Sequence, residues 1–125
     1  MQYPSKPEKE IWYACIEGPE AAAFERGTIQ LLDGQATVTL SPHFQEVMNP
    51  ATMTVQAIPL SADSKGLAII EKNENGFIIK ELWNGTGNYK VDWEVKAVRK
   101  GYENYQAVRD KNESLPILPS SPSRN

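Results

Sequence analysis

Apolar and polar residues alternate along much of the chain, which is the pattern of β-strands that bury one face. The longest example is 89–97, where the odd positions are apolar and the even positions are charged. Shorter segments that alternate, or that are apolar throughout, predict further strands at 11–16, 53–57, 67–70 and 77–79. Because 77–79 is apolar on both faces, we expect it to lie between two layers or against a neighbouring chain.

The segment 28–40 predicts a β-hairpin. Asp33 and Gly34 stand between two alternating runs, and they suit the two positive-φ positions of a type I′ turn. A hairpin folded at this turn would pair apolar residues across the two strands: Leu31 with Ala36, and Ile29 with Val38. The agreement between turn and register favours direct pairing of these strands.

One short helix is predicted after the hairpin. The segment 41–48 suits one or two helical turns, with Ser41 as the N-cap and Pro42 at the first helical position. The segment Gly85-Thr86-Gly87 predicts a second hairpin turn, which joins strand to strand. The sequence therefore predicts an all-β fold, an antiparallel sandwich of about seven strands with one short helix.

The length of 125 residues is that of a single domain. Both ends of the chain are rich in proline, serine and charged residues, and they hold too few apolar residues to form a core. We therefore expect three parts: a linker or stalk junction at 1–10, a β-rich domain at 11–109, and a flexible tail at 110–125.

Charge and composition exclude several classes of function. The net charge of −3 lacks the excess of lysine and arginine that a nucleic-acid partner requires. No segment approaches the roughly 20 apolar residues of a membrane-spanning helix, and the N-terminus shows no signal peptide. With one cysteine and one histidine, the chain alone cannot form a disulfide or a zinc site of nitrogen and sulfur ligands. We expect neither a metal nor a cofactor.

The candidate catalytic groups are few. Cys15 and His43 form the one possible thiol–imidazole pair, but Cys15 lies in an apolar strand segment, where a free cysteine is usually a small buried side chain. Asp92 and Glu94 lie two residues apart on one strand face, a spacing open to acid–base chemistry but typical of a solvated face. We predict no catalytic residues and a protein that is not an enzyme.

The aromatic residues are the best candidates for contact with a ligand. Trp12 and Trp93 lie in strand segments and belong to the predicted core. Other rings have polar neighbours and can reach the surface, where they would either stack on a sugar ring or anchor a partner chain. The predicted ligand-binding residues are Trp83, Asn84, Tyr102 and Tyr105.

The order of motifs along the chain resembles that of a known family. The motifs are 17–20 (EGPE), 26–28 (RGT), 34–36 (GQA), 38–40 (VTL) followed by Phe44, 54–56 (TVQ), 76–77 (GF) and 93–99 (WEVKAVR). Together they are similar to a β-rich module at the ends of bacterial and phage fibre proteins, and the resemblance covers about residues 11–109. It implies a tip or C-terminal domain that follows a fibrous, usually trimeric stalk.

We therefore expect a non-enzymatic structural and adhesive module, the terminal domain of a trimeric cell-surface or phage-like fibre. The resemblance implies a homotrimer and a glycan or protein receptor on a target cell, with three weak sites acting together. The expected location is the cell surface or an extracellular fibre, if the chain is part of a longer exported protein. Two alternatives stay open: a monomeric carbohydrate-binding module, and a small hydrolase with a surface carboxylate cluster.

Overall fold

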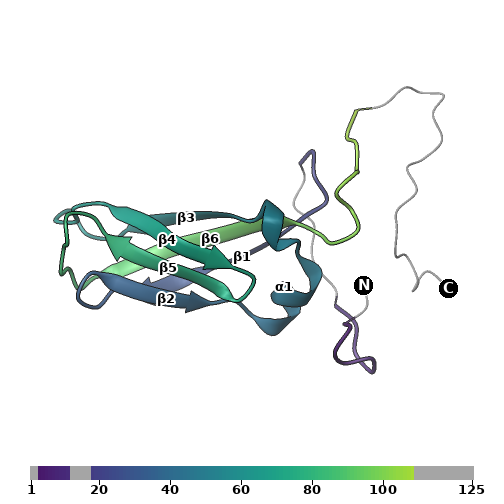
Figure 1. Cartoon of the computed structure of the whole chain (residues 1–125), viewed down its shortest axis with the longest axis horizontal. Coiled ribbons are helices and arrows are strands. Elements are labelled where there is room, and N and C mark those ends of the chain that lie inside the picture. Colours follow the sequence, from purple (N-terminus) through teal and green to yellow (C-terminus); the bar gives the residue numbers. More distant parts are fainter. Residues whose placement is uncertain (1–2, 12–17, 109–125) are drawn as a thin grey trace.

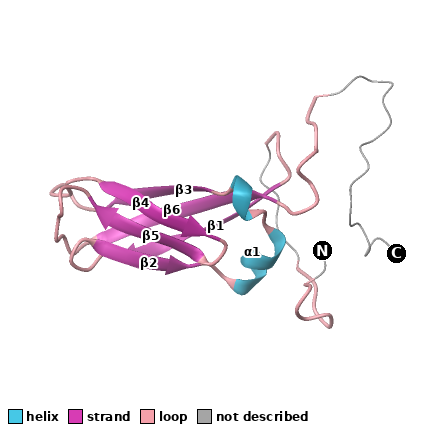
Figure 2. Ribbon diagram, in the orientation of Figure 1, coloured by secondary structure: helices cyan, strands magenta, loops and turns pink. Residues whose placement is uncertain are grey.

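Two small antiparallel sheets pack face to face in the computed structural model, which describes residues 3–11 and 18–108 (Figure 1; Figure 2). One sheet has the order β1-β6-β3, with β1 at Ala22–Gln30, β6 at Lys90–Val98 and β3 at Thr54–Pro59. The other has the order β2-β5-β4, with β2 at Gln35–Thr39, β5 at Gly76–Glu81 and β4 at Leu67–Asn73. The predicted all-β class is confirmed.

The apolar side of each strand's alternation fills the space between the sheets. In β6, Val91 and Val95 are fully buried, and Asp92 is exposed on the opposite face. Trp93 packs against the core as predicted. Its ring contacts the ring of Phe77, which belongs to the other sheet, in an edge-to-face arrangement with ring centres 5.6 Å apart. Burial of such a side chain stabilises the fold by about 1.5–3 kcal/mol, so this layer is the main source of stability.

The connection from β2 to β3 contains two short helices, α1 at Pro42–Val47 and the 3-10 helix η1 at Pro50–Thr52. Ser41 stands at the N-cap and Pro42 begins the helix, as predicted. The Ser41 hydroxyl donates to the carboxylate of Glu25 in β1, and its oxygen accepts no hydrogen bond from the N–H groups of the helix. Buried side chains of α1 close one end of the core.

The sandwich therefore has two unlike ends (Figure 1). The helix end consists of α1, η1, the 73–76 turn and residues 99–108. The N-terminal segment 3–11 also lies there, because the Ser5 hydroxyl donates to the Glu46 carboxylate of α1 at 2.8 Å. The loop end is the opposite end, made of residues 31–34, 60–66 and 82–89.

The predicted hairpin around Asp33 and Gly34 has the right turn and the wrong pairing. The two residues have φ angles of 50° and 75°, and the residues on either side exchange two backbone hydrogen bonds of 3.0 Å. Beyond them the strands separate, since β1 pairs with β6 and β2 pairs with β5. Ala36 consequently lies opposite Ile79 and not opposite Leu31. Two strands bury the same side chains whether they pack face to face across the core or pair within one sheet. The alternation of apolar and polar residues therefore does not distinguish these two arrangements of β1 and β2.

The predicted hairpin turn at 85–87 is also wrong, because β5 and β6 belong to different sheets. The segment 82–89 instead crosses from one sheet to the other. Of the five connections between strands within residues 18–108, four cross in this way, and only the β4–β5 turn stays in one sheet. That turn joins the strands predicted at 67–70 and 77–79.

Several predictions fall on residues that the structure does not describe. Of the predicted strand at 11–16, only Ile11 is described, and its side chain is buried. Trp12, Cys15 and the predicted tail at 110–125 lie outside the described residues. The described residues hold six strands, against about seven predicted.

The outer faces of the two sheets differ in chemistry. The outward positions of the β1-β6-β3 sheet hold five charged residues: Arg26, Lys90, Asp92, Glu94 and Lys96. Those of the β2-β5-β4 sheet are mostly neutral: Gln35, Thr37, Thr39, Ala68, Ile70, Glu71, Ile78 and Lys80. Ile70 stands at a β-bulge and is 53% exposed, and Ile78 is half-buried. An apolar stripe therefore stays uncovered on this sheet within the described chain.

We predict that Gly34→Ala destabilises the protein by about 2 kcal/mol or more. Gly34 has φ +75°, and a Cβ there would overlap the carbonyl oxygen of Gly85 in the neighbouring loop. The free energy of unfolding from urea denaturation measures the effect. The matched control is Gly18→Ala, since no atom lies within 4 Å of a Cβ at Gly18. Equal stability of the two variants would contradict the turn geometry.

Candidate functional site

The loop end presents a tryptophan to solvent. Trp83 is 84% exposed, and three leucines of the same end are exposed as well: Leu32, Leu60 and Leu82. Trp83 and Asn84 have φ angles of 60° and 52°, a region that residues other than glycine seldom occupy. The backbone therefore holds an unfavourable conformation at the point where it displays the indole ring.

A buried carboxylate holds this loop in place. Glu81 ends β5, is only 4% exposed, and lies where an unpaired carboxylate would be costly. It accepts hydrogen bonds from three groups of the adjoining loops: the N–H of Lys65 at 3.1 Å, the N–H of Gly87 at 2.9 Å and the hydroxyl of Tyr89 at 2.7 Å. Glu81 thus ties the 60–66 and 82–89 loops together beside Trp83.

The same contacts set the charge of the pair. The hydrogen bond from the Tyr89 hydroxyl is the main cause that lowers the pKa of Glu81 below its ordinary value of 4.5, and the N–H groups of Gly87 and Lys65 add to it. Burial raises the pKa of Tyr89 above 10.0, and its bond to Glu81 adds to the rise. At neutral pH, Glu81 is therefore ionised and Tyr89 keeps the proton that it donates.

Sequence reasoning did not identify Glu81, although the signal was present. The alternation of β5 places Phe77, Ile79 and Glu81 on the same inward side. A glutamate at the buried position of an apolar strand must find hydrogen-bond donors nearby. The donors come from two loops that are distant in sequence, so the pattern of one strand could not name them.

The structure does not bring the four predicted site residues together. Trp83 and Asn84 lie at the loop end, whereas Tyr102 and Tyr105 follow β6 at the helix end (Figure 1). Because β6 spans nine residues, the two pairs are about 30 Å apart. Tyr102 is half-buried and Tyr105 is 38% exposed. The two pairs therefore cannot contact the same small ligand.

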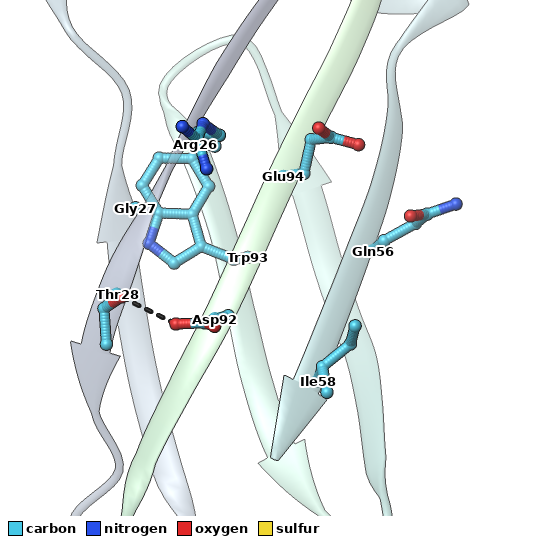
Figure 3. A pocket seen from close by; sticks show the side chains of 8 residues that line it. All are labelled: Arg26, Gly27, Thr28, Gln56, Ile58, Asp92, Trp93 and Glu94. Carbon is cyan, nitrogen blue, oxygen red and sulfur yellow. Dashed lines mark hydrogen bonds between the residues drawn. The ribbon is translucent and has the colours of Figure 1, made fainter. Parts of the chain in front are cut away.

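A second candidate surface lies on the outer face of the β1-β6-β3 sheet. A shallow depression of about 310 Å³ is lined there by Arg26, Gly27, Thr28, Gln56, Ile58, Asp92, Trp93 and Glu94 (Figure 3). Asp92 accepts a hydrogen bond of 2.7 Å from the Thr28 hydroxyl, and Glu94 pairs with Lys96 at 3.3 Å. The two carboxylates singled out from the sequence thus face solvent with partners. Residues of β1 and β3 complete the surface, and only the observed strand order brings them beside β6.

A serine–histidine contact at the start of α1 lacks the proton arrangement of a hydrolase. Ser41 Oγ lies 3.0 Å from Nε2 of His43 and also bonds the carboxylate of Glu25. The Ser41 hydroxyl donates its one proton to Glu25, so in the second contact its oxygen accepts from Nε2–H of His43. A serine nucleophile needs the reverse, with the histidine accepting the serine proton. The contact fastens α1 to β1.

Other site chemistry is limited in the part of the chain that the structure describes. Within residues 3–11 and 18–108, no three His, Cys, Asp or Glu side chains lie close enough to hold a metal ion. The same residues contain no helix that is long and apolar enough to cross a membrane. Comparison with known proteins found no match for this chain among family models, curated proteins or solved structures.

We predict that Glu81 makes stability depend on pH in the acid range. Its pKa is lower in the folded state than the value of 4.5, so its contribution is complete above that value and is lost as the pH falls through the folded pKa. Thermal unfolding followed between about pH 7 and pH 2 should show a smaller loss of stability for Glu81→Gln than for the wild type.

At neutral pH the same variant should melt about 5 °C or more below the wild type, because it removes the charge that three donors surround. Tyr89→Phe is the companion variant. It removes the main cause of the shift, so the pKa of Glu81 should move back toward 4.5. Identical pH profiles for all three proteins would show that Glu81 does not hold the loops.

Proposed function

We propose that this chain is a non-enzymatic recognition module, the terminal domain of a trimeric cell-surface or phage-like fibre, and that its loop end binds a glycan on a target cell. The observation that carries the proposal is Trp83, 84% exposed on a loop with two successive residues at positive φ. Backbone strain of this kind persists where the surrounding structure enforces it, and it clusters at functional sites. An exposed indole offers an apolar face on which a sugar ring can stack.

The groups around Trp83 suit a sugar. The amide of Asn84 makes no hydrogen bond within the described residues, so it is open to a hydroxyl both as donor and as acceptor. The bonds to Glu81 fix the loop before a ligand arrives. Prior fixing reduces the entropy that binding would otherwise cost, which favours a weak, rigid contact of this kind.

The placement of the chain's N-terminal segment supports a tip. Residues 3–11 lie at the helix end, opposite the loop that carries Trp83 (Figure 1). A stalk joined through this segment would hold the loop end away from itself and toward a target surface. The proposed orientation thus places the loop that carries Trp83 at the far end of the domain from the stalk.

The outer face of the β2-β5-β4 sheet is the proposed contact between subunits. Its outward positions carry two charges, Glu71 and Lys80, against five on the other sheet. The centres of subunit interfaces are depleted in charged residues, so the neutral face is the better candidate. Packing three copies through it would cover Ile70 and Ile78, and three weak glycan sites would then act together.

We predict that Trp83→Ala weakens binding to target cells or to a glycan array at least about tenfold, because a stacked aromatic ring is a typical binding hot spot. Tyr102→Ala at the helix end is the control and should bind as the wild type does. Thermal unfolding should show that both variants remain folded. Unchanged binding by Trp83→Ala would remove the loop end as the recognition surface.

We predict that the wild type is a trimer at tens of micromolar and that Ile70→Lys makes it monomeric. The substitution places a charge on the neutral face, where desolvation would oppose contact. Light scattering after size exclusion measures the mass. Ile58→Lys is the matched control, since Ile58 is 60% exposed on the other sheet, and it should stay trimeric. A monomeric wild type would favour the alternative, a monomeric carbohydrate-binding module.

A further inference from the structure

We propose that the depression on the outer face of the β1-β6-β3 sheet is a second binding site and that its ligand is a neutral sugar residue (Figure 3). The site shares no residue with the loop end. Two adjacent rows of the sheet build it, as the register of the strands shows. One row is Arg26, Glu94 and Gln56, and the next is Thr28, Asp92 and Ile58.

The floor of the site is made of Gly27 and Trp93. Gly27 and Trp93 lie opposite each other between the two rows. A Cβ on Gly27 would come within 3.0 Å of the Trp93 ring, and that ring packs on Phe77 of the other sheet. The Cβ position of Gly27 and the Trp93 ring therefore both point toward the core, and the partly exposed ring lies at the base of the depression. The resulting space of about 310 Å³ is at the lower limit for small-molecule sites, about 300 Å³, and suits a single sugar ring.

The two carboxylates of the site are held before any ligand binds. The Thr28 hydroxyl donates to Asp92 Oδ1 at 2.7 Å. Lys96 lies 3.3 Å from Glu94 Oε1. Each carboxylate has a second oxygen that can still accept a hydrogen bond. Both side chains lie on the central strand, which is paired on both sides. Ligand binding would therefore cost little additional conformational entropy at these two residues.

The donors of the site are open. Arg26 and Gln56 make no side-chain hydrogen bond within the described residues. Figure 3 shows them on either side of Glu94, one from β1 and the other from β3. Arginine offers five N–H donors, and glutamine offers both a donor and an acceptor. The depression thus presents unused donors beside fixed acceptors.

The combination of donors, acceptors and balanced charges in the depression indicates the class of ligand. Arg26 and Lys96 balance Asp92 and Glu94 in charge, so an anion would meet two carboxylates and a cation would meet a guanidinium. A sugar hydroxyl can donate to a carboxylate and accept from a guanidinium or an amide, so a neutral sugar satisfies both kinds of group. A protein partner would need buried aromatic or apolar anchors, and Ile58 is the one apolar side chain that the lining turns outward.

The test uses the full chain with Trp83→Ala, which removes the loop-end ring and leaves the depression intact. The probe is an array of neutral, sialylated and sulfated oligosaccharides. We expect this protein to bind neutral glycans and to discriminate against acidic ones. Adding Arg26→Ala should weaken that binding about tenfold or more, because a charge-assisted hydrogen bond is lost. Adding Lys80→Ala, which removes an equal charge from the other sheet, should change it less than about twofold.

The outcomes separate this proposal from the proposed function of the loop end. If Trp83→Ala abolishes all binding that the wild type shows, the proposed site in the depression is overturned and glycan binding at the loop end is supported. If Trp83→Ala binds as the wild type does, and Arg26→Ala reduces that binding, glycan binding at the loop end is overturned and the proposed site in the depression is supported. Preference for acidic glycans, equal effects of Arg26→Ala and Lys80→Ala, or a wild type that binds no neutral glycan would each overturn the second site.

Discussion

Each sheet of this protein has one apolar face, and only the other sheet can cover it. A sheet must bury its apolar face against another layer, so each sheet depends on its partner for stability. The chain meets this constraint by passing between the sheets at four of the five connections within residues 18–108. Three of those crossings gather at one end, and the loop that displays Trp83 is one of them. The surface proposed for recognition is therefore formed by the connections that the chain needs in order to pack one sheet on the other.

The sequence predicts the fold class well because alternation reports which side chains are buried. The strand at 89–97, the helix beginning at Pro42 and the turn at Asp33 and Gly34 were all predictable from local chemistry. The pairing of strands was not, because Leu31 and Ala36 become buried whether their strands lie side by side or face to face. Which strands form hydrogen-bonded pairs depends on the relative stability of all possible pairings among the six described strands. The sequence pattern of one strand does not report that stability.

The same distinction applies to the sites. Trp83 and Asn84 could be singled out because polar and glycine neighbours mark an exposed loop. Tyr102 and Tyr105 shared that context, but no sequence pattern shows that they lie at the other end of the molecule. The depression needs three strands in a particular order, so Arg26 and Gln56 could not have been connected with Asp92 before β6 was known to lie between β1 and β3.

The central position of β6 also governs how the chain can be made. Among the six strands within residues 18–108, β6 is the last in sequence, and it is the hydrogen-bonding partner of both β1 and β3. As the chain emerges from the ribosome, β2, β5 and β4 can pair first, but β1 and β3 must wait until residues 90–98 have followed. During that interval the apolar faces are uncovered, a condition in which nascent chains depend on chaperones and are prone to aggregate. For this domain, residues 90–98 must therefore leave the ribosome before the two sheets can pack together.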